Sequence, residues 1–486
     1  MEYLTRNFEP QNVLEQFENI CSIPHCSNHE HDLAEYITTV AKKLNLEINK
    51  DKAGNILIRK PAQFANNSIS SILLQGHMDM VCVKNEDCKI DMIREPVKLI
   101  LHNNTLRAEG TSLGADNAVG LCNMLAVMMS SDIEHPPLEL LFTVEEEIGL
   151  KGIRRFDMSC IKSKRMITMD CGDPDVMVIG GAGSIKADIS KQCKLEPVFG
   201  IPFKICFKGL KGGHSGIEIG KGRANAIELI GRLLISLIEK IPINLISIST
   251  EGTGNSIPKA AECIIVIDSN NTDVAINIMD RFYMDICTEY SKIEENLKFN
   301  YSAVEVSEKM MISINDTRDI ADFILLVPSD VQNRAIDNLN WVMCSSLLTN
   351  VICRNGCFNG KYSIRANLDE LKDNVYLKLH RICELLRFNI EINDDVPAWP
   401  IKYDSNLQDL CKKTYMEMFD DELKVEPIHG CVEAGIISYS VPYMDIVGIA
   451  PMSRGAHTTD EHLFFKTMKP FWEFLTNLLK NMCQES

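Results

Sequence analysis

The sequence of 486 residues lacks several features that would assign it to a class at once. It has no run of about 18 uninterrupted apolar residues, so no membrane-spanning helix is expected. Its first 20 residues carry acidic side chains and no cationic segment followed by an apolar run, so we expect no secretory signal and a cytoplasmic protein. It also has neither an H-E-x-x-H motif nor a Walker A loop.

Positive charge is scarce, because 50 Lys and Arg stand against 67 Asp and Glu and leave a formal net charge of -17. A surface that binds nucleic acid needs clustered Lys and Arg, so nucleic acid is not an expected partner. The 18 cysteines include no C-x-x-C pair; the closest pairs are Cys21 with Cys26 and Cys353 with Cys357. We expect reduced, mostly buried thiols, as in a cytosolic protein.

Apolar residues make up 45% of the chain, which suffices for folded cores, and the length predicts two or three domains. Short apolar runs typical of buried strands alternate with helical patterns near both ends of the chain. The predicted strands are 71–75, 138–144, 166–169 and 444–449, and the predicted helices are 11–20, 30–46 and 118–129. This alternation predicts an α/β domain with a mixed sheet flanked by helices.

The middle of the chain has a different pattern, with alternating strands and longer helices. The strands are predicted at 203–207, 245–250, 262–268 and 361–367, and the helices at 224–239, 273–292 and 371–386. We interpret residues 186–397 as an inserted α+β domain. Residues 1–185 and 398–486 would then rejoin as one catalytic domain.

Candidate metal ligands follow the first two predicted strands. His77 comes just after the strand 71–75, and Asp79 could orient a ligand histidine from behind. The three glutamates 145–147 follow the strand 138–144, where adjacent carboxylates repel one another unless a cation or water relieves them. One glutamate could ligate a metal while its neighbour acts as a general base, although a solvated loop is the alternative.

The glycine-rich turn before the helix 118–129 has two interpretations. Asp116 could cap the helix, or its two oxygens could bridge two cations. The letters GTSLG at 110–114 also fit a nucleophile elbow, but that motif needs a buried strand before it, and the preceding residues are Arg107, Ala108 and Glu109. We therefore regard that match as chance.

Two further candidates follow later strands. Asp170 ends the strand 166–169, although Asp173 could take its place and Cys171 could be a soft ligand. His457 follows the strand 444–449. Taken together, the four strand ends could supply two sites of about three ligands each, with Asp116 shared. Nitrogen and carboxylate donors predict zinc, with manganese or cobalt as substitutes, and a pair of metals suits hydrolysis by an activated water.

Eight stretches spread over residues 74–461 carry a family resemblance: LQGHMDMVCVKN, LGADNAVG, TVEEEIGLKG, MDCGD, GLKGGHSG, NSIP, HGCVEAG and RGAHTTDE. They resemble the co-catalytic zinc exopeptidases, most closely the aminoacyl-histidine dipeptidases, also called Xaa-His or cytosol non-specific dipeptidases. The resemblance implies a zinc-exopeptidase-like α/β domain interrupted by a lid domain that also forms a homodimer.

The resemblance also implies roles for individual residues in a site with two Zn²⁺ per subunit. The first zinc would be held by His77, Asp116 and Asp170, and the second by Asp116, Glu147 and His457. Glu146 would be the general base, and Asp79 would orient His77.

Three residues in the predicted insertion, and Gly430 in the segment that follows it, would bind substrate. His214 would stabilise the oxyanion, Asn255 and Arg365 would receive the terminal carboxylate, and Gly430 would offer its backbone. Cys431 stands where related sequences commonly have glycine or another small residue, so the shape of the pocket is open.

The favoured function is hydrolysis of Xaa-His and other short unblocked dipeptides by a zinc-activated water. An N-acyl amino-acid deacylase with the same metal site is the alternative within the enzyme class. A non-catalytic binding protein that retained the fold is the alternative from another class, and the complete ligand set with Glu146 disfavours it.

Overall fold

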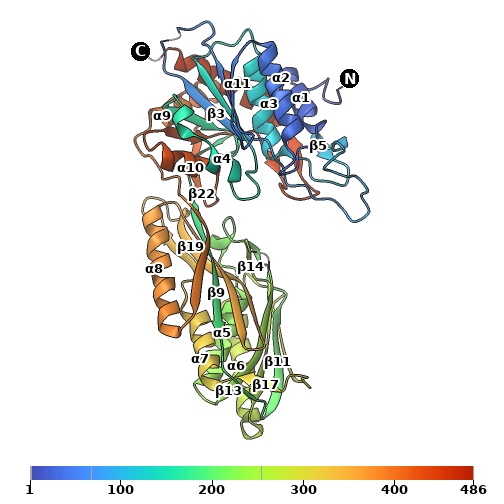
Figure 1. Cartoon of the computed structure of the whole chain (residues 1–486), viewed down its shortest axis with the longest axis vertical. Helices are drawn as coiled ribbons and strands as arrows, with labels where there is room; N and C mark the ends of the chain where they lie inside the picture. The colour runs from blue at the N-terminus through green and yellow to red at the C-terminus, as the bar shows by residue number, and fades with distance from the viewer. Residues whose placement is uncertain (1–2, 67, 253, 485–486) are drawn as a thin grey trace. The chain divides into compact units, whose positions relative to one another are not determined.

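The computed structural model describes residues 3–66, 68–252 and 254–484, which form two compact units (Figure 1). The first unit comprises Met1–Gly181, Trp399–Ile428 and Val432–Ser486. The inserted unit comprises Ala182–Ala398 together with the short segment His429–Cys431. The division lies close to the sequence boundaries at 186 and 397, but the return of His429–Cys431 was not predicted.

The chain leaves and re-enters the first unit at adjacent positions. Gly181 and Trp399 exchange two backbone hydrogen bonds, of 2.9 Å from the N–H of Gly181 and 3.0 Å from that of Trp399. The two ends of the insertion are therefore joined as a single antiparallel bridge.

The first unit contains helices on both sides of a central sheet. Its helices are α1 (Gln11–Cys21), α2 (His31–Lys43), α3 (Ala115–Met129), α4 (Lys151–Arg155), α9 (Asn406–Phe419), α10 (Glu433–Ser440) and α11 (Phe465–Met482). The strands of the central sheet are β1 (Glu47–Lys50), β2 (Ile56–Lys60), β3 (Ile72–His77), β6 (Leu138–Thr143), β7 (Arg165–Thr168), β8 (Val176–Gly181), β22 (Lys424–Ile428) and β23 (Asp445–Gly448).

The central sheet is mixed, with the order β1-β2-β6-β3-β7-β23-β8-β22. β6, β3, β7 and β23 run parallel, whereas β1, β2 and β8 provide antiparallel pairings. The predicted α/β class with a mixed sheet is therefore confirmed. Every residue of β3 and β6 is buried, which explains their continuous apolar runs.

The helices that cover this sheet differ in how deeply they are buried. Helix α3 is apolar on all sides, and nearly all its residues are buried between the sheet and α1. Helix α1 instead has one apolar face, with Val13, Leu14, Phe17 and Ile20 inside and charged residues outside.

A small four-stranded sheet completes the first unit, with the order β24-β25-β5-β4. Its strands are β4 (Leu99–His102), β5 (Thr105–Ala108), β24 (Ser453–Arg454) and β25 (His462–Phe464). Nearby, Cys26 and Cys82 form a disulfide, because the bridge between Cys26 and Met80 brings the two segments together. The expectation of reduced thiols is therefore wrong for this pair, whereas the other 16 cysteines are free.

The inserted unit is an antiparallel sheet with helices. Its helices are α5 (Ala226–Ile238), α6 (Thr272–Glu289), α7 (Ile314–Leu326) and α8 (Asp369–Leu386). Its longer strands are β9 (Gly183–Gln192), β11 (Ile201–Lys208), β13 (Ile243–Glu251), β15 (Ala260–Ile267), β16 (Lys298–Ala303), β19 (Val342–Arg354), β20 (Cys357–Ala366) and β21 (Asn389–Val396). Its shorter strands are β10 (Leu195–Pro197), β12 (Gly213–His214), β14 (Ser256–Ile257), β17 (Met310–Ile312) and β18 (Asp330–Arg334).

The main sheet of the inserted unit has the order β16-β11-β15-β13-β19-β20-β9-β21, with β18 beside β19. Strand β9 alternates buried and exposed residues, as expected for a sheet with one covered face. Helix α5 packs against α6 and α7, and α7 packs against α8, so the helices form a continuous layer. The unit has its own apolar core, including Phe207, Phe323 and Phe358.

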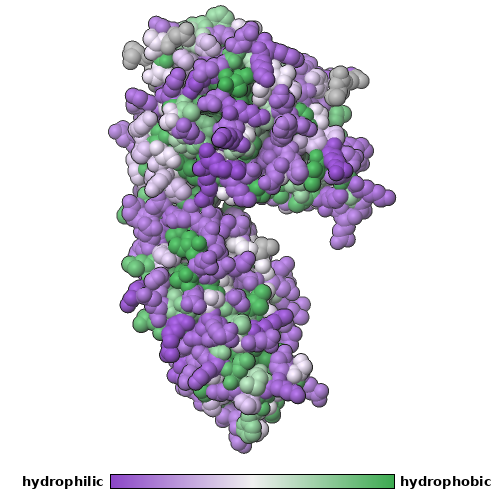
Figure 2. All heavy atoms as spheres, viewed as in Figure 1, coloured by the Kyte–Doolittle hydropathy of each residue, from purple (hydrophilic) through white to green (hydrophobic). Residues whose placement is uncertain are grey.

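The surface that Figure 2 displays is mainly hydrophilic, with apolar side chains scattered over it. Among the described residues, no helix is both long and apolar enough to span a bilayer.

Candidate metal centre

The predicted metal ligands lie at one edge of the central sheet of the first unit. His77 ends β3, while Glu147 and Asp170 follow the adjacent strands β6 and β7. Because these strands run parallel, their carboxyl ends meet at the same edge. The irregular start of α3 supplies Asp116, and the connection between β24 and β25 supplies His457. Five segments of the chain thus converge on one place.

Asp116 lies between the two histidines. Its Oδ1 is 3.1 Å from Nε2 of His77, and its Oδ2 is 3.6 Å from Nε2 of His457. Asp116 has non-helical backbone angles, φ -84° and ψ 104°, within the span of α3. Its carboxylate is thereby directed at the histidines and not at the backbone of its own helix. Of the two interpretations of this turn, the geometry favours the carboxylate that serves two sites.

Two groups of three side chains could each hold a cation. Asp170 Oδ1 is 3.1 Å from His77 Nε2, and Glu147 Oε1 is 2.8 Å from His457 Nε2. In each group, His77–Asp116–Asp170 and Asp116–Glu147–His457, the donor atoms lie within 4.8 Å of one another. The same distance also relates His77, Glu146 and Glu147. The first two groups match the two sets predicted from the resemblance.

The ring of His77 is oriented by Asp79. Nδ1 of His77 is 3.0 Å from the backbone carbonyl oxygen of Asp79, which can only accept a hydrogen bond. Nδ1 therefore donates to that oxygen, which leaves Nε2 directed at the carboxylates, where it would be the atom that binds a cation. The Asp79 carboxylate is farther away, at 3.5 Å, so the backbone of Asp79 makes the closer contact.

The Asp79 carboxylate instead holds the turn that carries the two glutamates. Its Oδ1 accepts the backbone N–H of Glu146 at 2.9 Å, and its Oδ2 accepts that of Glu147 at 3.1 Å. Ser27 donates a third hydrogen bond, of 2.8 Å, to Oδ2. Asp79 therefore links the end of β3 to the end of β6. The third glutamate, Glu145, points elsewhere and pairs with Arg155 at 2.7 Å.

The histidines show how strongly this centre attracts positive charge. Hydrogen bonds to Asp116 and Glu147 raise the pKa of His457 to about 10, even though partial burial opposes this. Burial lowers the pKa of His77, but Asp170 and Asp116 outweigh burial and hold that pKa well above its usual range. In both cases the neighbouring carboxylates stabilise a cation at the position of the ring.

Two carboxyl groups of the centre have raised pKa values. Burial raises the pKa of Asp170 to about 6, and Asp116 and Glu147 add to the effect. Burial, with Asp170 and Glu147 nearby, also holds the pKa of Glu146 well above its usual range. A dication among them would relieve this repulsion. The donor set of imidazole nitrogens and carboxylate oxygens, without thiolate, fits zinc and also admits manganese or cobalt.

The alternatives left open by the sequence are excluded by other contacts. Asp173 accepts two hydrogen bonds of 2.8 Å from Arg454 and belongs to none of the ligand groups found among the described residues. Cys171 is likewise in none of the ligand groups among the described residues. Ser112 of the GTSLG match is fully buried and donates to the carbonyl oxygen of Val81 at 2.7 Å, so it is not an exposed nucleophile.

A buried glutamate beneath the centre was not singled out from the sequence. Glu433 begins α10 and is fully buried. Its Oε2 accepts hydrogen bonds from Gln75 on β3 at 2.6 Å and from Thr143 on β6 at 2.5 Å. Burial raises its pKa to about 8. The motif HGCVEAG contained this residue, but only the paired strands reveal its partners.

The residues predicted to bind substrate lie in the inserted unit. His214 pairs with Ser256 across β12 and β14, and the carbonyl oxygen of the adjacent Asn255 accepts the N–H of Ser215 at 2.9 Å. Nδ1 of His214 accepts the N–H groups of Gly216 and Ile217 at 3.2 and 3.1 Å. In the neutral ring the proton therefore lies on Nε2, which can donate to a substrate oxygen.

Arg365 lies on β20 and is only 6% exposed. Its Nη1 approaches the sulfur of Cys431 at 3.7 Å, and its Nε is buried without a partner among the described residues. Gly430 has open space where a side chain would stand, and its carbonyl oxygen accepts the N–H of Ala182 at 2.9 Å. A buried guanidinium with an unused donor suits a carboxylate.

Gly216 marks the place where these residues meet. A Cβ on Gly216 would lie 2.4 Å from the carbonyl oxygen of His429, 3.2 Å from the His214 ring and 3.4 Å from Nε of Arg365. His429 in turn contacts Ser345 Oγ at 2.7 Å and Asn367 Oδ1 at 3.2 Å. His214, Arg365 and the segment 429–431 therefore form one cluster within the inserted unit.

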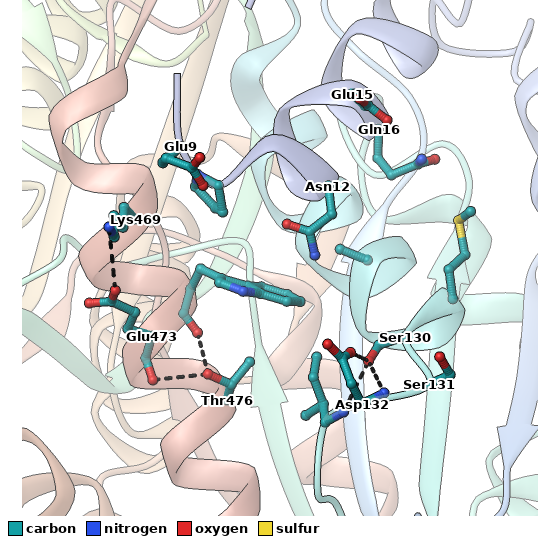
Figure 3. Close-up of a pocket in the computed structure, with 15 residues that line it drawn as sticks. Glu9, Asn12, Glu15, Gln16, Ser130, Ser131, Asp132, Lys469, Glu473 and Thr476 are labelled. Carbon is teal, nitrogen blue, oxygen red and sulfur yellow. Dashed lines mark hydrogen bonds and ion pairs between the residues drawn. The ribbon is translucent and has the colours of Figure 1, made fainter. Parts of the chain in front are cut away.

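A separate cavity of about 710 Å³ lies between α1, the end of α3 and α11 (Figure 3). Glu9, Glu15, Asp132 and Glu473 line it together with Trp472. None of the predicted metal ligands or substrate residues belongs to its lining.

Comparisons with known proteins identify the family of the chain. The sequence model of Peptidase family M20/M25/M40 matches residues 73–481. A cytosol non-specific dipeptidase of Escherichia coli (strain K12) is 32% identical over 478 residues, which are 97% of this chain and 98% of the relative.

Solved structures show the same fold. An aminoacylhistidine dipeptidase from Vibrio alginolyticus superposes with a TM-score of 0.90 and 28% identity, and the match covers 98% of this chain and 97% of that one. The dipeptidase Dug1p of Saccharomyces cerevisiae shares the fold at a TM-score of 0.54 and 15% identity, over 97% of this chain and 96% of the other.

Proposed function

The chain belongs to peptidase family M20/M25/M40, and on that premise we propose that it is a dipeptidase that hydrolyses Xaa-His and other short unblocked dipeptides with two zinc ions. Two relatives that match nearly the whole chain are dipeptidases by name, which supports this substrate class. Manganese or cobalt could replace zinc at the same donors.

One observation carries the proposal: the two oxygens of Asp116 face two different histidines, His77 at 3.1 Å and His457 at 3.6 Å. A carboxylate in this position can serve two cations at once. Asp170 and Glu147 complete the two groups on either side. When bound there, zinc would polarise the peptide carbonyl and lower the pKa of a water molecule.

The remaining steps fall to side chains of the chain itself. Glu146 would accept a proton from the attacking water and return it to the leaving amine. Its turn is held by the Asp79 carboxylate, which accepts the N–H groups of Glu146 and Glu147. Asp79 also fixes the ring of His77 through its carbonyl oxygen. The Glu146 side chain lies beside His77 and Glu147 and, among the described residues, makes no hydrogen bond to His77 or His457.

Residues of the inserted unit would recognise the substrate. Arg365 and Asn255 would bind the terminal carboxylate, and the free Nε–H of Arg365 supports that role. His214 would donate from Nε2 to the oxygen that becomes negative during attack. Gly430 would offer its backbone, with Cys431 beside it shaping the pocket. We further propose that the inserted unit is a lid that forms a homodimer and that the protein is cytoplasmic.

A panel of Xaa-His dipeptides, Gly-Gly and N-acetyl amino acids, assayed with and without a chelator, tests the substrate class. We expect chelator-sensitive cleavage of the free dipeptides and little cleavage of the N-acetyl compounds. Preferred cleavage of N-acetyl amino acids would instead indicate the deacylase. Absence of zinc from the purified protein, with no hydrolysis after zinc or manganese is added, would indicate a binding protein.

A further inference from the structure

The amino end of α3 poses a hydrogen-bonding problem that its own sequence does not solve. The first N–H groups of a helix have no partner within the helix and are usually capped by a side chain. The N-cap position of α3 is Gly114, which has no side chain and adopts φ 75°. Asp116 is the nearest acidic residue, but its carboxylate faces His77 and His457.

The hydrogen-bond acceptor for this turn is Glu461, which lies 345 positions after Asp116. Oε2 of Glu461 accepts the backbone N–H groups of Leu113 and Gly114, both at 2.8 Å, and Oε1 accepts the N–H of Asp116 at 3.1 Å. Glu461 is only 2% exposed. Both carboxylate oxygens are therefore used, and all three donors belong to the turn that carries Asp116.

Glu461 is also tied to the second histidine. It lies four residues after His457, and its own N–H donates to the carbonyl oxygen of Thr458 at 3.3 Å. The next residues form β25, which pairs with β5 in the small sheet. One side chain thus connects the segment that bears His457 to the turn that bears Asp116.

We infer that Glu461 is a positioning residue of the metal centre: it accepts the N–H groups of the turn that leads into α3, in place of Asp116, and so leaves both Asp116 oxygens for the cations. The inference rests on the ligand assignment in the proposed function. An anion at a helix amino end is stabilised by the helix dipole and by the N–H groups it accepts. Glu461 can therefore remain buried beside other carboxylates. Without it, Asp116 would be the nearest acidic side chain for the uncapped N–H groups.

The inference predicts a specific defect in Glu461→Gln. The amide can accept with one oxygen only, and its NH₂ group would face a backbone N–H. Changes to groups that support metal ligands typically cost about 10- to 100-fold in metal affinity. We expect the zinc dissociation constant, measured by competition with a chromophoric chelator, to rise by about that factor. At saturating zinc, KM for a dipeptide should stay within about twofold of wild type while kcat falls.

Glu139, on β6 of the central sheet, provides a control, although it also pairs with Arg59 at 3.0 Å. It is also 2% exposed and accepts the backbone N–H groups of Lys162 and Ser163 at 2.9 and 2.8 Å. Glu139→Gln should lower the melting temperature as Glu461→Gln does, but leave the zinc dissociation constant unchanged. Equal weakening of zinc binding in both variants, or wild-type zinc affinity in Glu461→Gln, would overturn the inference.

Two further measurements keep the inference testable. If Glu461→Gln does not fold, Glu461→Asp retains the charge but is shorter by one methylene, and it should show the same selective loss of zinc affinity. A crystal structure of Glu461→Ala should show the Asp116 carboxylate turned toward the backbone of α3; an unmoved Asp116 contradicts the inference. Wild-type protein that binds two zinc ions but cleaves no dipeptide would remove the proposed function and leave this inference intact, whereas wild type without zinc affinity removes the inference.

Discussion

The two units present opposite electrostatic environments to a bound group. In the first unit, carboxylates of Asp116, Glu147 and Asp170 gather where parallel strands end, and their net effect is to attract positive charge. In the inserted unit, Arg365 and His214 present hydrogen-bond donors from an antiparallel framework. The first arrangement suits cations and the second suits the anionic parts of a substrate.

Two histidines make the difference explicit. Hydrogen bonds to Asp116 and Glu147 raise the pKa of His457 to about 10. Burial, with the Arg365 charge nearby, lowers the pKa of His429 to about 3. The same ring is therefore held near a positive form in one unit and in a neutral form in the other. Environment decides the role, because the residue type is identical.

The largest effect is expected where one residue serves both halves of the metal centre. Asp116→Ala removes a donor from each ligand group, so both cations should bind weakly. Loss of a general base lowers activity by up to roughly 10⁴-fold, and dipeptidase activity should fall by more than that here. Metal analysis of the purified variant should show the loss of zinc directly. Retention of two zinc ions per chain would contradict the shared-ligand assignment.

Glu146→Ala should separate catalysis from metal binding. Glu146 lies beside both ligand groups, but the two complete groups do not require it. We expect zinc content to match wild type while kcat falls by about 10²- to 10⁴-fold. Glu145→Ala is the matched control, because that neighbour pairs with Arg155 and should keep its turnover. Wild-type turnover in Glu146→Ala would remove the proposed general base.

Arg365→Lys tests the inserted unit without touching the ligands. Lysine keeps the charge but loses the planar fork that binds a carboxylate through two hydrogen bonds. A hydrogen bond to a charged group contributes about 1.5–3 kcal/mol, so kcat/KM should fall by about 10- to 150-fold, mainly through KM. Zinc content should not change. Arg354→Lys, at the exposed end of the neighbouring β19, is the control and should behave as wild type.

The smallest effect concerns stability at acid pH. The pKa of His429 is about 3 in the folded chain, below the ordinary value of about 6.5, so between these values the unfolded chain binds more protons at this position. The free energy of unfolding should therefore fall as pH falls through this window, by up to about 1.4 kcal/mol per pH unit from this group. The free energy of unfolding, measured by urea titration at pH 4, 5 and 6, should depend less steeply on pH in His429→Gln than in wild type. The same pH dependence in both proteins would show that His429 does not cause this loss of stability.

Much of the metal centre could be predicted from sequence because its residues follow apolar strands. The ends of β3, β6 and β7 are visible as buried runs that stop at a polar residue, and parallel strands bring such ends together. His77 could be named as a candidate in this way, whereas spacing alone left Asp170 and Asp173 as alternatives for the next ligand. The α/β class followed from the same alternation.

Contacts between distant segments could not be predicted in this way. The N–H of Asp116 donates to Glu461 across 345 positions, and the side chain of Gln75 donates to Glu433 across 358. The disulfide between Cys26 and Cys82 depends on a single bridge beside Met80. Periodicity and local motifs carry no information about which buried carboxylate meets which backbone group. Such pairings emerge only when the whole sheet is assembled.

The paired backbone of Gly181 and Trp399 makes the inserted unit a candidate for removal by protein engineering. Because the chain departs and returns through one hydrogen-bonded bridge, a tight loop could replace residues 182–398 without stretching the backbone at the seam.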